Sequence, residues 1–108
     1  MTAFISVRAL ADLEQIYSDI SSRQGPAQAD QFLSTARETV EFLARNPEAG
    51  PHPGWRTRHK TIRFWVINRT NFLIFYFAEH GRVSIERVLD GRRDVKRIIN
   101  QRREEARG

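Results

Sequence analysis

The side chains of this sequence best suited to chemistry are the cations of its second half. A first group lies in the segment WRTRHK, where Trp55 is followed by Arg56, Arg58, His59 and Lys60. Further cations follow along the chain: Arg63, Arg87, Arg92 and Arg93. Clustered cations beside an aromatic ring suit the binding of a polyanion or of an acidic protein. For Trp55 by itself we favour a simpler interpretation, in which the ring anchors a surface loop.

Charge is distributed unevenly along the chain. Residues 1–54 hold four arginines and seven acidic residues, whereas residues 55–108 hold fourteen Lys or Arg and six acidic residues. The halves therefore carry net charges of −3 and +8, which give the total of +5. A basic face can serve solubility alone, but the concentration of basic residues in one half of the chain favours a surface for a polyanion or an acidic protein partner.

Several kinds of catalytic and cofactor site lack their residues in this sequence. There is no cysteine, and the three histidines have no partners at the spacing of metal ligands. No glycine-rich phosphate loop precedes a helix, and no nucleophile elbow is present. We therefore expect no metal and no cofactor, and we interpret each histidine as a surface residue.

Three apolar runs between residues 61 and 89 predict an antiparallel meander. The runs are residues 61–67, 71–77 and 83–89, and short turns with Asn68-Arg69-Thr70 and with Gly81 separate them. The middle run, NFLIFYF, is typical of a strand buried on both faces. Arg87 falls on an otherwise apolar phase of the third run. Either a β-bulge turns it away, or it lies at the rim with a paired head group.

Two helices are predicted before the meander. The first spans residues 7–23 after an N-cap at Ser6, and the second begins at Pro26 and ends at Asn46-Pro47. Their apolar stripes are Val7, Leu10, Leu13, Ile16, Tyr17 and Ile20 in the first, and Ala29, Phe32, Leu33, Ala36, Val40, Leu43 and Ala44 in the second. The short turn at Gly25 makes them an antiparallel hairpin on one face of the sheet.

Residues 1–5 suit a brief strand at the edge of the meander, and residues 92–106 predict a third helix with a narrow apolar stripe. Residues 47–60 are rich in proline and glycine and predict a surface loop. We therefore expect one α+β domain over residues 1–108: a short N-terminal strand, a helical hairpin packed on an antiparallel meander, and a C-terminal helix.

Three motifs stand out along the chain: ALADLEQIYSDI at 9–20, ARNPEAGPHPG at 44–54, and FLIFYF followed by IERVLDGRRD at 72–77 and 85–94. In these motifs and in its order of elements, the chain resembles the ParE/RelE superfamily of bacterial toxins from type II toxin–antitoxin systems. The last motif is similar to the ending of ParE-like and plasmid-stabilisation proteins, although the family often has His where this chain has Asp90.

The resemblance implies one of two mechanisms. RelE-like members cut messenger RNA on the ribosome with a base, an acid and surrounding cations, a role that Arg63, Arg87, His59 and Lys60 would take here. Such members often carry Tyr or His near the C-terminus, whereas this chain has neither after His80. ParE-like members bind DNA gyrase and stall it without catalysis. The departures from the RelE pattern favour the ParE-like mechanism.

Either mechanism implies an antitoxin, whose tail in the family packs as a helix plus an added strand. For the ParE-like mechanism the expected antitoxin is ParD-like. The +8 half favours an acidic tail. The expected contact residues for target or antitoxin are Trp55, Arg56, Arg58, Arg63, Trp65, Arg87, Arg92 and Arg93. A third interpretation is a degenerate member that binds only its antitoxin and, through it, operator DNA.

Without a signal sequence or an apolar run long enough for a membrane span, we place the protein in the cytoplasm.

Overall fold

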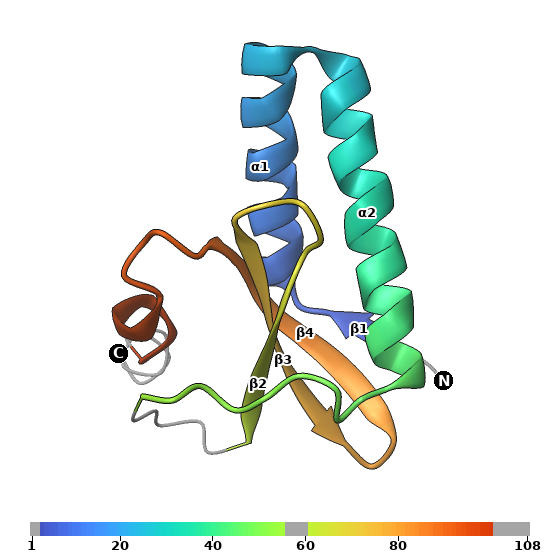
Figure 1. Ribbon diagram of the computed structural model, residues 1–108, viewed down its shortest axis with the longest axis vertical. Helices are drawn as coiled ribbons and strands as arrows, with labels where there is room; N and C mark the ends of the chain where they lie inside the picture. The colour runs from blue at the N-terminus through green and yellow to red at the C-terminus, as the bar shows by residue number, and fades with distance from the viewer. Residues whose placement is uncertain (1–2, 56–60, 101–108) are drawn as a thin grey trace.

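The computed structural model describes residues 3–55 and 61–100 of the chain. Its elements are β1 (Ala3–Ile5), α1 (Val7–Gln24), α2 (Pro26–Arg45), β2 (Ile62–Val66), β3 (Phe72–Glu79) and β4 (Arg82–Asp90), and residues 95–100 are helical. The strands form one sheet in the order β1-β4-β3-β2, with β1 parallel to β4 and the other pairs antiparallel. The predicted α+β fold is confirmed (Figure 1).

The helical hairpin follows from the residues at its turn. Gly25 has a φ of 98°, which favours glycine, and Pro26 occupies the first turn of α2. At the start of α1, the Ser6 hydroxyl oxygen accepts a hydrogen bond of 3.0 Å from the N–H of Ala9. The two helices run antiparallel, and their connection projects beyond the sheet (Figure 1). None of the described helices is long and apolar enough to cross a membrane.

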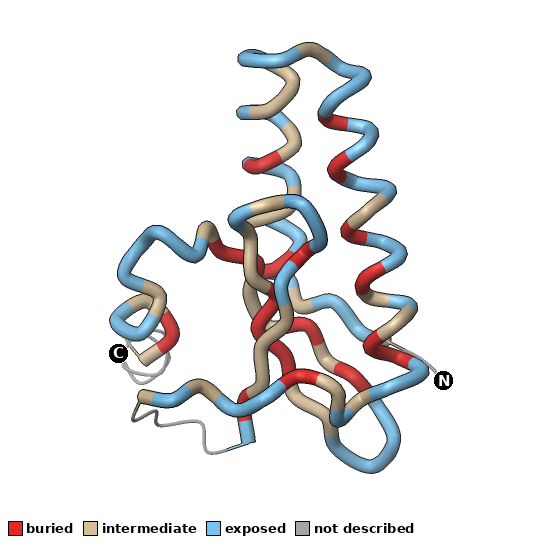
Figure 2. The backbone as a smooth tube through the Cα atoms, viewed as in Figure 1, coloured by how far each residue is buried: buried red, intermediate tan, exposed pale blue. Residues whose placement is uncertain are grey.

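Apolar side chains form a buried cluster on each face of the sheet, and the buried positions along the chain are marked in red in Figure 2. On one face, α1 and α2 pack through Ile16, Phe32 and Leu43 onto a cluster that includes Ile74 and Tyr76. On the other face, the helical residues 95–100 contribute Ile99 to a cluster with Ile62, Phe75 and Leu89. Successive residues of β3 therefore enter opposite clusters, which confirms that this strand is buried on both faces.

The predicted stripe of α1 is wrong at its beginning. Val7 and Leu10 are 85% and 50% exposed, whereas Ala9 is fully buried. The reason is that the N–H of Ser6 donates to the carbonyl oxygen of Ile85 at 2.9 Å, which fixes the rotation of the first turn. The side chain thus turned toward the sheet is that of Ala9.

Two further expectations for the hairpin are corrected. Leu33, assigned to the stripe of α2, is exposed. Tyr17, assigned to the apolar stripe of α1, is only partly buried, and its hydroxyl donates a hydrogen bond of 2.6 Å to the carboxylate of Asp30. The ring thus bridges α1 and α2 at their surface, where its hydroxyl can reach a charged acceptor.

The predicted start of the third helix is also wrong. The described helical residues begin at 95 rather than 92. The carboxylate of Asp90 accepts hydrogen bonds from the backbone N–H of Arg92 at 2.9 Å and from its guanidinium at 2.7 and 3.0 Å. This side-chain turn competes with helix formation directly after β4. Residues 101–106 of the predicted helix lie outside the described part of the chain.

Candidate functional site

The predicted site residues lie on different parts of the fold. Arg63 belongs to β2, Arg87 to β4, and Arg92 and Arg93 to the turn after β4. Four further predicted members lie outside the described residues: Arg56, Arg58, His59 and Lys60. The contacts of each described residue therefore decide what it can do.

Arg63 holds the loop after α2 against the sheet. Its guanidinium donates to the carbonyl oxygens of Gly50 at 2.7 Å and of Glu48 at 3.3 Å. Beside it, the N–H of Phe64 donates to the carbonyl oxygen of Pro51 at 3.1 Å, so the loop runs along the outer edge of β2. The charge of Arg63 is thus engaged in positioning the loop.

Tyr76 holds the same loop from within the core. Its side chain is fully buried, and its hydroxyl donates to the carbonyl oxygen of Pro47 at 3.0 Å while accepting from the N–H of Gly50 at 2.9 Å. Burial raises the pKa of Tyr76 above its ordinary value, although the hydrogen bond from Gly50 and the charge of Arg63 act in the opposite direction. The hydroxyl therefore stays protonated at neutral pH and can donate.

A β-bulge in β4 sets the direction of Arg87. Arg87 lies opposite Phe75 of β3, whereas Ile85 lies opposite the next residue, Tyr76. Glu86 is therefore the extra residue of the bulge. A β-bulge, the first of the two explanations for an arginine on this apolar phase, is therefore present.

The head group of Arg87 is also paired, as the second explanation supposed. Its guanidinium donates to both carboxylate oxygens of Asp12 on α1, at 2.8 and 3.0 Å. The side chains of Arg87 and Asp12 are only 14% and 15% exposed. The same carboxylate accepts a bond of 3.0 Å from the N–H of Val88. The pair thus attaches the helical hairpin to the sheet.

The two tryptophans pack on opposite faces. Trp55 lies against Phe75 with ring centroids 6.5 Å apart, as expected of a ring that anchors a loop. Trp65 of β2 stacks on Phe42 of α2 at 5.4 Å. Both rings therefore contribute to packing, Trp65 on the face covered by the helical hairpin and Trp55 on the other face.

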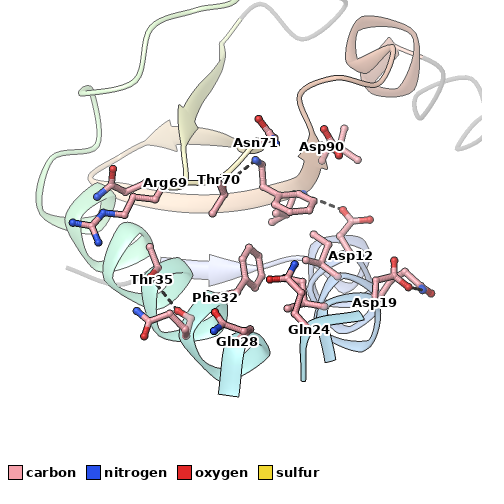
Figure 3. A pocket seen from close by; sticks show the side chains of 18 of the residues that line it. Asp12, Asp19, Gln24, Gln28, Phe32, Thr35, Arg69, Thr70, Asn71 and Asp90 are labelled. Atoms are coloured by element: carbon pink, nitrogen blue, oxygen red, sulfur yellow. Dashed lines mark hydrogen bonds between the residues drawn. The ribbon is translucent and has the colours of Figure 1, made fainter. Parts of the chain in front are cut away.

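A hollow of about 970 Å³ lies between the helical hairpin and the β2–β3 turn, and we call it the hairpin groove. Figure 3 shows Phe32 between the helices and this turn. The lining of the hairpin groove includes the apolar side chains of Ile16, Phe32, Phe72 and Val88. Amide side chains also line it: Gln15, Gln24, Gln28, Gln31, Asn68 and Asn71. Such a surface suits a polypeptide segment, because apolar contacts give affinity and amides fix the register.

Charges of both signs surround the hairpin groove. The charged residues on its helical side are Asp12, Asp19, Glu38 and Arg23, and those on the other side are Arg69, Asp90 and the predicted residues Arg92 and Arg93. Sequence reasoning missed the helical side, because exposed glutamines and acids on a helix are the ordinary composition of a solvated face. Only the β2–β3 turn opposite them makes these residues part of a groove.

Substitution of Asp90 by Asn tests the turn that carries Arg92 and Arg93. Hydrogen bonds from Arg92 lower the pKa of Asp90 from 3.8 to about 2, and the guanidinium contributes more to this shift than the backbone N–H. A carboxyl whose pKa is lower in the folded state stabilises the fold above its unfolded pKa, and this contribution is lost as the pH falls from about 4 to about 2. Because the Arg92 side chain is 72% exposed and solvent screens its charge, we expect a loss below about 1 kcal/mol at pH 7.

Urea unfolding of the wild-type and Asp90→Asn proteins at pH 7 and at pH 2.5 measures this difference. We expect the deficit of the variant to shrink at the lower pH, where the wild-type carboxylate also begins to be protonated. A deficit of equal size at both pH values would contradict the assigned role of the Asp90 charge.

Comparisons with known proteins agree on one family. Residues 3–95 match the model of the ParE toxin of the type II toxin–antitoxin system, parDE. Toxin ParE1 of Mycobacterium tuberculosis, in strains CDC 1551 / Oshkosh and H37Rv, is 29% identical over 101 residues, covering 88% of this chain and 94% of the relative. The chromosomal ParDE TA system from P. aeruginosa includes a chain of the same fold, with a TM-score of 0.68, 23% identity, and coverage of 82% of this chain and 92% of that one.

Proposed function

Since this chain belongs to the ParE family of toxins from type II toxin–antitoxin systems, we propose that it inhibits DNA gyrase by binding, without catalysing a reaction itself. A ParD-like antitoxin with an acidic tail neutralises it, and the net charge of +5 favours such a partner in approach rate and in choice. The antitoxin, rather than the toxin, provides any contact with operator DNA.

The contacts of Arg63 and Arg87 are the observation that supports binding rather than RNA cleavage. A ribonuclease mechanism would take its charge stabilisation from these two guanidinium groups. Arg63 instead donates to two loop carbonyls, and Arg87 donates to both oxygens of Asp12. Moving either group to a reacting phosphate would break contacts that hold the loop or the hairpin to the sheet.

We place the target-facing surface around the turn that follows β4. Arg92 and Arg93 are exposed there and line the hairpin groove. Gyrase on DNA presents a polyanion beside the protein, so exposed arginines would add attraction that weakens with salt.

A plasmid supercoiling assay with purified protein, gyrase and ATP tests this function. We expect supercoiling to be lost and linear DNA to accumulate, and we expect both effects to disappear when the antitoxin is added first. The same plasmid incubated with the protein but without gyrase is the control, because a nuclease acting by itself would also linearise it.

Undisturbed supercoiling in the presence of a folded, growth-inhibiting protein would contradict the proposal. Cleavage of messenger RNA on ribosomes by that preparation would then assign the toxin to the RelE-like mechanism. Absence of growth arrest when the protein is expressed alone would assign it to the degenerate, antitoxin-binding class.

A further inference from the structure

The backbone of Arg69, in the turn between β2 and β3, has an unusual conformation. Its φ is 65°, in the left-handed region that favours glycine and, among the other residues, asparagine and aspartate. In the described part of the chain, the only other residue besides glycine with a positive φ is His80, at 53° in the turn between β3 and β4. A residue in this region is strained, so the surrounding structure must impose the conformation.

Hydrogen bonds within the β2–β3 turn impose it on Arg69. The N–H of Ile67 donates to the carbonyl oxygen of Phe72 at 2.9 Å and closes the hairpin. The carbonyl oxygen of Ile67 accepts from the N–H and the hydroxyl of Thr70, at 3.1 and 2.7 Å. The same hydroxyl oxygen accepts from the N–H of Phe72 at 3.0 Å. Because Ile67 is fully buried, the turn is anchored to the core, and the backbone of Arg69 has a fixed position.

The side chain of Arg69 takes no part in this arrangement. It is exposed, and its guanidinium makes no hydrogen bond or ion pair with any residue that the structure describes. By contrast, Arg63 donates to loop carbonyls, and Arg87 donates to Asp12. Strained residues are found where a binding site requires them, so a strained arginine that does nothing for the fold indicates a ligand.

The β2–β3 turn lies beside the turn that follows β4. The N–H of Gly91 donates to the carbonyl oxygen of Asn71 at 2.7 Å, so residues 68–71 and 90–93 meet at one end of the sheet. Figure 3 shows the labelled residues of both segments on the sheet side of the hairpin groove. Together the two segments contain three arginines and one acidic residue, which leaves an excess of two positive charges at this end.

Arg69 and Arg93 carry this excess charge, because Arg92 is engaged with Asp90 at 2.7 Å. Both asparagines of the β2–β3 turn are also exposed. Guanidinium and amide groups are typical donors to the phosphate oxygens of DNA. The acidic side chains on the helical side of the hairpin groove repel a phosphate from its interior, so a DNA strand is directed along the sheet side.

We propose that Arg69 binds a backbone phosphate of the DNA on which gyrase acts, and this inference rests on the proposed function. The regularly spaced phosphates of DNA can engage cations on both adjoining turns, whereas a single carboxylate of a protein would engage one of them. Because phosphate contacts carry no sequence information, the contact does not depend on the bases. The toxin then contacts both the enzyme and its DNA.

Substitution of Arg69 by Gly tests this contact with the fold preserved. Glycine adopts the positive φ without strain, so the variant should melt no lower than the wild type. His80→Gly is the backbone control, because it relieves the same kind of conformation at the other end of β3. Arg37→Gln is the charge control, because Arg37 is exposed on α2 and does not line the hairpin groove. A labelled DNA duplex is titrated with each protein at several salt concentrations, and inhibition of gyrase supercoiling is measured in parallel.

We expect Arg69→Gly to weaken duplex binding about three- to tenfold, because one phosphate contact is lost. For the same reason, the slope of the logarithm of the binding constant against the logarithm of the salt concentration should become less steep by about 1. The concentration that half-inhibits gyrase should rise about three- to tenfold as well. His80→Gly and Arg37→Gln should each change duplex binding less than about twofold.

Three results would overturn the inference. One is a folded Arg69→Gly protein that binds the duplex with the affinity and salt dependence of the wild type. Another is an equally large loss in Arg37→Gln, which would reduce the effect to net charge. The third is a wild-type protein that inhibits gyrase without binding the duplex, while Arg69→Gly inhibits more weakly. That result would assign Arg69 to a carboxylate of gyrase and leave the proposed function intact.

The proposed function has a separate outcome in the same experiment. Failure of the folded wild-type protein to inhibit gyrase would remove the proposed function. The duplex titration contains no gyrase, so it would still report whether Arg69 contacts a phosphate.

Discussion

Substitution of Asp12 by Ala is expected to lower the free energy of unfolding by about 3 kcal/mol. The Asp12 carboxylate accepts three hydrogen bonds, two from the guanidinium of Arg87 and one from the N–H of Val88, all between 2.8 and 3.0 Å. Both charged side chains are about 15% exposed. Removing one member of a poorly hydrated ion pair is much more destabilising than removing an exposed pair, because the other charge loses its compensation.

The comparison variant for this experiment is Asp19→Ala on the same helix. Asp19 is exposed and accepts one side-chain hydrogen bond from Gln15 at 3.0 Å, so we expect a change below about 0.5 kcal/mol. Urea unfolding followed by circular dichroism measures both variants. An Asp12→Ala protein as stable as Asp19→Ala would show that the pair does not hold the hairpin.

Loss of the Asp12 carboxylate should also affect function through the hairpin groove. Asp12 lines this groove, and its pair with Arg87 connects the helical side of the groove to the strand that borders the other side. We therefore expect Asp12→Ala to release α1 from β4 and so to change the shape of the hairpin groove. A substitution at the exposed Asp19 only removes one charge from the lining of the groove, because Asp19 does not attach α1 to β4.

Substitution of Gly50 by Ala is expected to lower stability by about 3 kcal/mol. A Cβ atom at this position would lie 2.4 Å from the carbonyl oxygen of Phe64 and 2.6 Å from the hydroxyl of Tyr76. Neither neighbour can move easily, because one belongs to the backbone of β2 and the other to a fully buried ring. Overpacking against such atoms costs about 1–3 kcal/mol, and the N–H of Gly50 would also move away from Tyr76.

The same loop supplies a matched control in Gly54. A Cβ atom at Gly54 would meet no atom within 4 Å, so Gly54→Ala is expected to be neutral or slightly stabilising. Thermal unfolding of the two variants measures the difference, which we expect to be about 10 °C or more for a domain of this size. Equal melting temperatures would show that the loop can leave the sheet without penalty, and the roles of Arg63 and Tyr76 would have to be revised.

The sequence by itself determined the elements, because their signals are local. Gly25-Pro26 separates two helices through one residue of positive φ and one without a backbone donor. Successive side chains of a strand point to opposite faces of the sheet, so in the continuous apolar run 72–77 the neighbours Ile74 and Phe75 lie on opposite faces. Each of these features depends on neighbours within a few positions, so composition and spacing reveal them.

Only the tertiary structure decided which side chains are engaged and which surfaces stay open. Asp12 and Val88 are 76 positions apart, and Tyr76 meets Gly50 across 26 positions, so no local pattern indicates either contact. The exposure of Val7 has the same origin, because the bond from Ser6 to Ile85 sets the rotation of α1. Long-range hydrogen bonds of this kind satisfy backbone and charged groups wherever the fold brings partners together, and among the described residues none of them engages the guanidinium of Arg69.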